Sequence, residues 1–223
     1  MASFLGTEAC MARINVANGA HALTCALFGC LLPGEQLLVA TGDPLPPKTS
    51  MITGPHESLQ HWGVGVSTVP LCTDGSVDVH SVLELAAELQ PDAVVIQRGP
   101  GLDCALGASA PRRMLHMREL TALVHKLRAR CAQCRIVIDN EGAELLEAQE
   151  PGSIEGVDVV CGALAGNLGA GVMQQGGYVA GKQVLVERAC ARASAPGLSL
   201  DAGSVSGDTL RTMFQSAPCC PAE

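Results

Sequence analysis

Aromatic residues are almost missing from this chain of 223 residues, since Phe, Trp and Tyr together make up 2% of it. Hydrophobic residues nevertheless account for 48%, so Ala, Val and Leu have to fill the core. Small side chains fill space less well than aromatic rings, and we therefore expect modest stability unless a partner covers part of the surface. The length is sufficient for one full α/β domain with a sizeable core.

Clustered positive charge is lacking as well. The formal net charge is −8, which argues against nucleic acids and anionic membranes as partners, because both require clustered cations. The short basic run between Arg112 and Arg130 is interpreted as a solvated helix face. No signal peptide opens the chain and no apolar run is long enough to span a bilayer. We expect a cytoplasmic protein.

Cysteine is abundant, with eleven residues. An odd number without a secretion signal fits free thiols in a reducing compartment. Cys131 and Cys134 form a C-x-x-C pair at a predicted turn between a helix and a strand. A redox or metal role is one interpretation of this pair, and buried structural thiols are the other. No second pair stands at zinc spacing, so we predict no metal site.

Short apolar strands alternate with helices along the chain. The predicted strands are 36–40, 65–71, 93–97, 135–139, 157–161 and 177–180, and the predicted helices are 19–31, 57–62, 78–89, 113–130, 141–150 and 182–192. Strands that are apolar on both faces predict a three-layer α/β fold, with a mainly parallel sheet between helices. We expect one domain over residues 1–206, a proline-rich loop over 41–53 and a weakly structured tail over 207–223.

Ligands of such sheets bind beyond the carboxyl ends of the strands. Asp139 ends one predicted strand, where it could bond a protonated ring nitrogen or cap the next helix. Arg98 follows another strand, where it could hold a carboxylate or phosphate or form a surface salt bridge.

A third candidate is the helix start Asn18-Gly-Ala-His21, where freed N–H groups and the helix dipole favour an anion. A plain N-cap gives the same pattern. His21 could lie over a flat ring or make a local hydrogen bond.

Several segments, in order, are similar to one family. These are Phe4–Ala9, Asn18–Leu23, Ile96–Arg98, Ile138–Asn140 and Gly176–Gly181. The chain resembles the aluminium-resistance proteins, which are methionine gamma-lyase-like or cystathionine beta-lyase-like enzymes of fold type I that depend on pyridoxal 5′-phosphate. The resemblance implies the large domain of that fold, pyridoxal 5′-phosphate as cofactor, a homodimer, and elimination on a sulfur amino acid. It also implies an N-terminal segment and a small C-terminal domain, which we expect to be absent.

The resemblance assigns cofactor contacts residue by residue. Asn18, Gly19, Ala20 and His21 correspond to the phosphate loop and ring contact, Asp139 to the partner of the ring nitrogen, and Arg98 to the arginine of a shared strand. Asn18 and Ala20 replace the usual hydroxyl residues.

Gly166 stands where the family carries its Schiff-base lysine, and Asn167 follows it. Ala163 and Gly142 replace a serine and a tyrosine. An imine needs a primary amine, so we assign no catalytic residue. Three lysines exist, at positions 48, 126 and 182, and only Lys48, in the proline-rich loop, could reach a ligand. We predict a family member that has lost its activity, the alternative being a non-catalytic scaffold or binding protein.

Overall fold

A seven-stranded sheet forms the centre of the computed structural model, in the order β1-β7-β6-β5-β4-β2-β3. The structure describes the chain except residues 44–47, 100–111, 170–172, 195–197, 199–205 and 217–223. The strands are β1 (Ala9–Arg13), β2 (Gln36–Val39), β3 (Gly65–Thr68), β4 (Ala93–Gln97), β5 (Arg135–Asp139), β6 (Val159–Ala163) and β7 (Gly177–Gly181). Strands β2 to β6 pair in parallel, whereas β7 is antiparallel to both β6 and β1. The expected mainly parallel sheet is confirmed.

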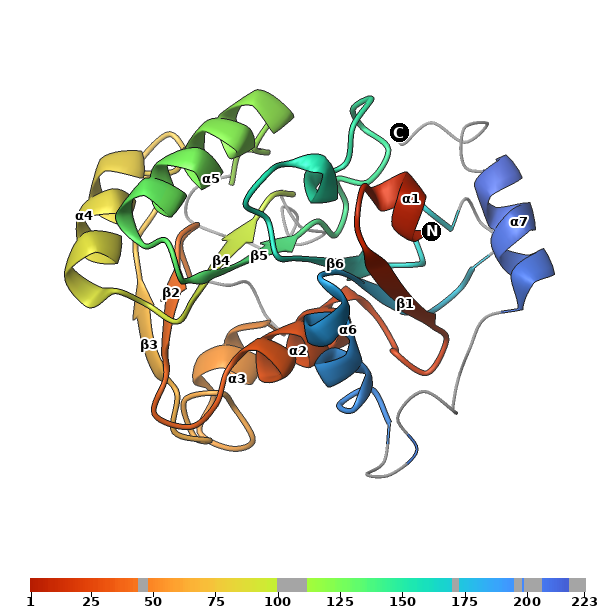
Figure 1. The fold of residues 1–223 in the computed structure, drawn as a ribbon, viewed down its shortest axis with the longest axis horizontal. Helices are drawn as coiled ribbons and strands as arrows, with labels where there is room; N and C mark the ends of the chain where they lie inside the picture. The colour runs from red at the N-terminus through yellow and green to blue at the C-terminus, as the bar shows by residue number, and fades with distance from the viewer. Residues whose placement is uncertain (44–47, 100–111, 170–172, 195–197, 199–205, 217–223) are drawn as a thin grey trace.

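Helices cover both faces of this sheet (Figure 1). The helices are α1 (Ala2–Leu5), α2 (Gly19–Cys30), α3 (Lys48–Thr53), α4 (Val79–Leu89), α5 (Met117–Arg130), α6 (Gln183–Cys190) and α7 (Gly207–Ser216), with a 3-10 turn η2 at Pro151–Ser153. Helices α4 and α5 lie on one face, and α2, α3 and α6 lie on the other. The three-layer α/β fold that the sequence predicts is therefore confirmed.

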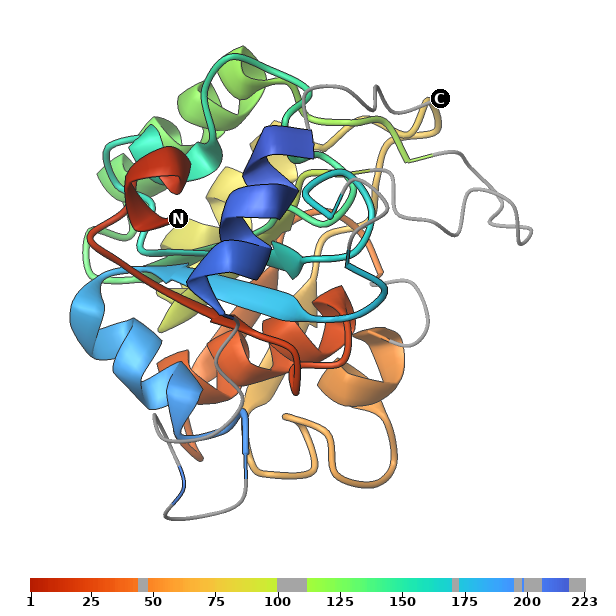
Figure 2. The same cartoon turned by 90° about the vertical axis from the view of Figure 1, so that its right-hand side faces the viewer.

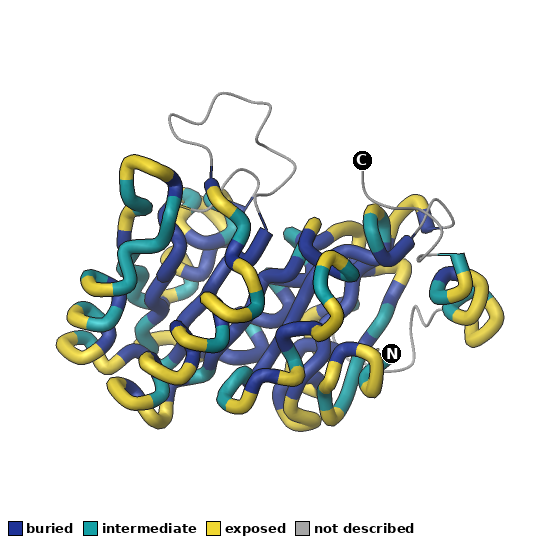
Figure 3. The backbone as a smooth tube through the Cα atoms, turned by 90° about the horizontal axis from the view of Figure 1, so that it is seen from above, coloured by how far each residue is buried: buried dark blue, intermediate teal, exposed yellow. Residues whose placement is uncertain are grey.

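Two apolar clusters form the core, one on each face of the sheet. Val94 and Ile96 belong to the cluster under α4 and α5, while Val95 and Val137 belong to the cluster over α2. Consecutive residues of a strand point to opposite faces, so a strand buried on both sides is apolar throughout. Figure 3 shows this arrangement, with buried strands inside and exposed helix surfaces outside.

Three local predictions differ from the structure. The proline-rich segment contains α3, and residues 57–62 form turns rather than a helix. The segment 141–150 is not helical either: Gly142 and Leu145 have φ angles of 80° and 63°, which an α-helix cannot contain. The carboxylates of Glu141 and Glu144 instead turn inward and contact Lys48 of α3 and Tyr178 of β7.

The predicted tail contains a helix, α7, at the β1 edge of the sheet (Figure 2). Its Met213 is buried in the core, and the rings of Phe214 and Phe4 lie 5.2 Å apart. The buried Met213 and the partly buried Phe214 give α7 the tertiary contacts that a short helix requires.

Candidate functional site

A close ion pair at the carboxyl end of the sheet joins two buried charges. Asp139 is the last residue of the central strand β5, and its side chain is 1% exposed. Its Oδ2 atom lies 2.5 Å from Nζ of Lys48, the first residue of α3, whose side chain is 7% exposed. A buried carboxylate is costly unless a cation is paired with it, and here Lys48 supplies that cation.

Glu141 extends this pair toward the start of α2. Its Oε2 atom lies 2.9 Å from Nζ of Lys48. Its carboxyl group also lies against Gly19, since a Cβ atom built on Gly19 would be 2.2 Å from Cδ of Glu141. A carboxylate at a helix N-terminus is stabilised by the helix dipole. Lys48, Asp139 and Glu141 together are called the ion cluster below.

The protonation state of the ion cluster follows from its charges. Burial disfavours the charge on Lys48, but the carboxylates of Asp139 and Glu141 outweigh burial and raise the pKa of the Lys48 amine. Burial raises the pKa of Asp139, while the Lys48 ammonium opposes that shift. Lys48 is therefore a cation at neutral pH, and a protonated amine is not a nucleophile.

The space beside the ion cluster is small. A cavity of about 10 Å³ lies there, lined by Leu23, Val39, Thr41, Lys48, Ile52, Val95, Gln97 and Asp139. That volume is about the space of one water molecule, whereas an engineered protein cavity that binds benzene has roughly 150 Å³. A substituted pyridine ring does not fit in this cavity, and the carboxylate that would bond its nitrogen is paired with Lys48. The residues in this arrangement do not fit pyridoxal 5′-phosphate.

The predicted anion cradle is a well-capped helix start. Oδ1 of Asn18 accepts a hydrogen bond from the backbone N–H of His21 at 2.9 Å. Nδ1 of His21 accepts one from the N–H of Ala17 at 3.1 Å, and burial lowers the pKa of the imidazole. The local hydrogen bond considered for His21 is thus present. Ala20 lies in the first turn of α2 and contributes no hydroxyl. The cofactor roles of these four residues stay predictions.

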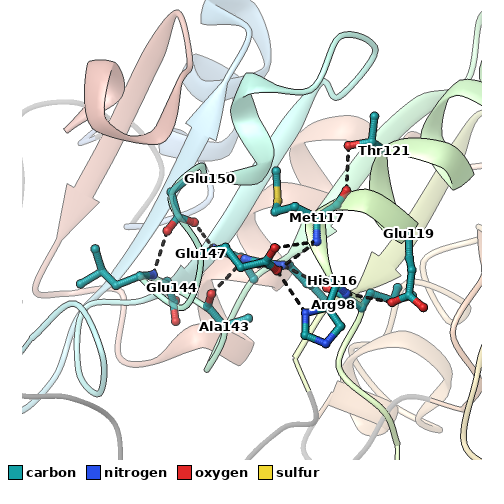
Figure 4. A network of polar contacts seen from close by, with 12 residues as sticks. Arg98, His116, Met117, Glu119, Thr121, Ala143, Glu144, Glu147 and Glu150 are labelled. Atoms are coloured by element: carbon teal, nitrogen blue, oxygen red, sulfur yellow. Dashed lines mark hydrogen bonds and ion pairs between the residues drawn. The ribbon is translucent and has the colours of Figure 1, made fainter.

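Arg98 lies on the other face of the sheet from Asp139. Gln97 and Asp139 are partners in the β4–β5 register, so the next residue, Arg98, points the opposite way. The guanidinium is fully buried and donates to the carbonyls of Leu115 and Ala143, to Oδ1 of Asn140 and to Oε1 of Glu147. Figure 4 shows this network, which also joins the start of α5. The Arg98 guanidinium is thus bonded to protein groups on the face opposite the Asp139 side chain, although the Arg98 backbone N–H donates to the Asp139 carbonyl. Its predicted role in holding a carboxylate or phosphate stays a prediction.

A second set of buried polar side chains, which includes Glu144 and Tyr178, lies next to the Arg98 network. Nδ2 of Asn140 donates to Glu150, and Oη of Tyr178 lies 3.3 Å from Oε1 of Glu144. Glu144 also accepts a hydrogen bond from the N–H of Gly142. Burial raises the pKa of Glu144 to about 8, so this carboxyl group is largely protonated at neutral pH.

Gly166 is a turn residue after β6, with φ of 80°. A Cβ atom built on it meets none of the described atoms within 4 Å. Asn167 beside it donates to the carbonyl of Glu144 at 3.0 Å, which places this turn next to the segment that follows Asp139. Ala163 ends β6 and is buried.

Two lysines besides Lys48 lie elsewhere. Lys182 precedes α6, and its Nζ lies 2.6 Å from Oδ1 of Asp158. Lys126 is on the exposed surface of α5.

The sequence does not predict the ion cluster or the contact between Glu144 and Tyr178. Lys48 follows a proline-rich stretch and pairs with a residue 91 positions away, and no local pattern encodes such a pairing. The sequence does show that lysine is rare. The chain has three lysines, so each of them is a candidate partner for a buried carboxylate.

In the part of the chain that is described, no group of three or more His, Cys, Asp or Glu side chains could hold a metal ion. Within that same part, every helix is too short or too polar to cross a membrane.

Cys131 and Cys134 are buried free thiols, and their Sγ atoms lie 2.9 Å apart.

Known proteins are similar to this chain in sequence and in fold. The family model described as methionine gamma-lyase matches residues 1–222. The uncharacterized protein YnbB of Bacillus subtilis (strain 168) is 31% identical over 220 residues, which are 96% of this chain and 49% of YnbB. A structure from Listeria innocua, described as a candidate cystathionine beta-lyase involved in aluminum resistance, is 29% identical with a TM-score of 0.86. The matched region is 98% of this chain and 52% of the Listeria chain.

A more distant structure supports the fold. The pyridoxal-5′-phosphate dependent protein YhfS from Escherichia coli is 20% identical, with a TM-score of 0.66, over 97% of this chain and 50% of its own. At that identity the likeness concerns the fold alone, which is the fold of type I pyridoxal-phosphate enzymes. The chain spans about half the length of the curated relatives it matches.

Proposed function

The chain belongs to the methionine gamma-lyase family, and on this premise we propose that it is a non-catalytic member. It keeps the fold of carbon–sulfur lyases and serves as a binding or scaffold protein without their elimination chemistry. The observation that carries the proposal is the absence of a free amine at the site: position 166 is glycine, and Lys48 is a protonated partner of Asp139.

Each lysine of the chain supports this proposal. Lys48 has a raised pKa, because two carboxylates hold its proton. Lys182 is paired with Asp158, and Lys126 lies on α5, away from the carboxyl end of β5. An imine requires an unprotonated amine beside the substrate, and none of the three lysines provides one.

The size of the site supports the proposal independently. The cavity at Asp139 has a volume of about 10 Å³, so neither the cofactor ring nor an amino-acid substrate fits inside it. We therefore assign no catalytic role to Asp139 in this chain. Its role is to hold Lys48, and through Lys48 the loop that carries Glu141, against α2.

Two measurements test the proposal. Purified protein is mixed with pyridoxal 5′-phosphate, its absorbance spectrum is recorded, and borohydride is added before tryptic peptides are mapped by mass spectrometry. We expect no protein-linked absorbance band and labels only at the low, even level of exposed lysines. Assays for thiol and 2-oxo acid release from sulfur amino acids should stay at the level of a buffer blank. A single lysine labelled in stoichiometric amount, or turnover above the blank, would refute the proposal.

A further inference from the structure

The ion cluster reproduces two charges that a bound cofactor would bring. A cation lies on Asp139 at 2.5 Å, where a protonated ring nitrogen would bond. An anion, the carboxylate of Glu141, lies at the first residue of α2, where a phosphate would bind. Both charges come from side chains of this chain, and an ion pair of 2.9 Å joins them.

We propose that Lys48 and Glu141 act as a built-in replacement for the cofactor, and that Lys48 keeps pyridoxal 5′-phosphate out of the site. The inference rests on the proposed function and deepens it, since it gives the reason why the fold is stable without a cofactor at this position. Asp139 lies at the end of a central strand with a 1% exposed side chain. Without a cation such a carboxylate destabilises the fold, because its desolvation is uncompensated.

Among the described ion pairs, Lys48 supplies the cation on Asp139. A further hydrogen bond to this carboxylate comes from a neutral group, the N–H of Glu141, which donates to Oδ1 at 3.3 Å. Arg98, which follows the neighbouring strand β4, points to the opposite face and is engaged by Asn140 and Glu147. Removal of Lys48 therefore leaves a buried carboxylate for which an external pyridinium is a suitable partner.

The test compares non-covalent retention of pyridoxal 5′-phosphate by wild type, Lys48→Ala, and Lys48→Ala combined with Asp139→Asn, measured by equilibrium dialysis at neutral pH. We expect Lys48→Ala to bind at least about tenfold more tightly than wild type, because the truncated side chain frees both the space and Asp139. The double variant should return to the wild-type level, because an asparagine side chain carries no charge. Lys182→Ala is the matched control. It also removes a lysine from an ion pair, but the Lys182 side chain is 64% exposed.

Each outcome decides the inference. Equal retention by wild type and Lys48→Ala would overturn it. If Lys48→Ala does not fold, the double variant should recover folding, because the unpaired carboxylate is gone; failure to recover would overturn it as well. A stoichiometric borohydride label on Lys126 or Lys182 of the wild type would refute the proposed function and leave this inference standing.

Discussion

Nζ of Lys48 lies 2.5 Å from Oδ2 of Asp139, although 91 positions separate the two residues in the sequence. The contact ties α3 to the end of the central strand β5. It satisfies the carboxylate that the family resemblance assigns to the ring nitrogen of the cofactor. The consequence is a site in which the positive charge comes from the protein.

A lysine returned to position 166 should react with the cofactor aldehyde. In Gly166→Lys the new side chain meets no described atom within 4 Å at its Cβ, although φ of 80° costs roughly 1–2 kcal/mol for a residue other than glycine. In the Lys48→Ala background, in which the control below is also made, we expect a borohydride-stable label at residue 166, whereas with Lys48 in place residue 166 should label only at the level of the exposed lysines. Peptide mapping by mass spectrometry measures both yields.

Gly142→Lys is the matched control for that experiment. Gly142 also has φ of 80° and an unobstructed Cβ position among the described atoms, so the backbone strain is the same. It should label no better than the exposed lysines. Equal labelling at positions 142 and 166 would contradict the assignment of Gly166 to the lysine position.

Stability should fall as pH rises through the neutral range. The pKa of Glu144 is raised from 4.5 to about 8 by burial, so between these values the folded state binds more protons than the unfolded state. The contribution of protonated Glu144 to the free energy of unfolding is therefore complete below about pH 4.5. It is lost as the pH approaches 8. Urea unfolding should show a decrease on the order of 3 kcal/mol between about pH 5 and 8.

Glu144→Gln should remove most of this slope, because glutamine imitates the protonated acid toward Gly142 and Tyr178. The exposed Glu84, on α4, provides the control: Glu84→Gln should leave the pH profile within about 0.5 kcal/mol of wild type. An unchanged slope in Glu144→Gln would place the titrating group elsewhere.

Loss of the buried guanidinium should be severe. Arg98→Met leaves Asn140, Glu147 and two carbonyls without their donor, and we expect a loss of about 3–5 kcal/mol in the free energy of unfolding. Arg113→Met removes an exposed pair with Asp74 at 3.4 Å and should cost less than about 1 kcal/mol. Denaturant titrations of the two variants should differ accordingly; similar losses would disprove a structural role for Arg98.

The neighbouring thiols of Cys131 and Cys134 should form a disulfide under mild oxidation. Their Sγ atoms lie 2.9 Å apart, and the hydrogen bond from Cys134 lowers the pKa of Cys131. A diazene oxidant takes up both thiol hydrogens and is reduced to the hydrazine as the S–S bond forms. Trypsin releases residues 131–135 as one peptide, whose mass should fall by two hydrogen atoms. Loss of the reduced peptide without this product would indicate pairing with other cysteines.

Part of the candidate site could be predicted from strand ends alone. The apolar strand before Asp139 predicts this residue at the carboxyl edge, and the structure puts it at the end of β5. Whether Arg98 faces the same way as Asp139 depends on the register between their two strands, which this pattern does not give. Strand alternation puts residues 97 and 98 on opposite faces, and the β4–β5 register matches Gln97 with Asp139.

The segment 141–150 could not be predicted in the same way. Its Glu, Ala and Leu residues favour a helix by propensity, yet Glu141, Glu144 and Glu147 bond to Lys48, Tyr178 and Arg98. Those inward-facing bonds outweigh the few tenths of a kcal/mol per residue that propensity contributes. Local sequence does not encode partners on other strands and helices.

The sequence by itself determined the alternation of apolar strands and helices, the family, and the glycine at position 166, because periodicity, the order of short segments and residue identity can all be read along the chain. The tertiary structure alone decided that Lys48 closes the site and that Arg98 turns away from it. A buried charge takes its partner from whatever the fold brings within reach, and for Asp139 that partner came from a helix 91 positions away.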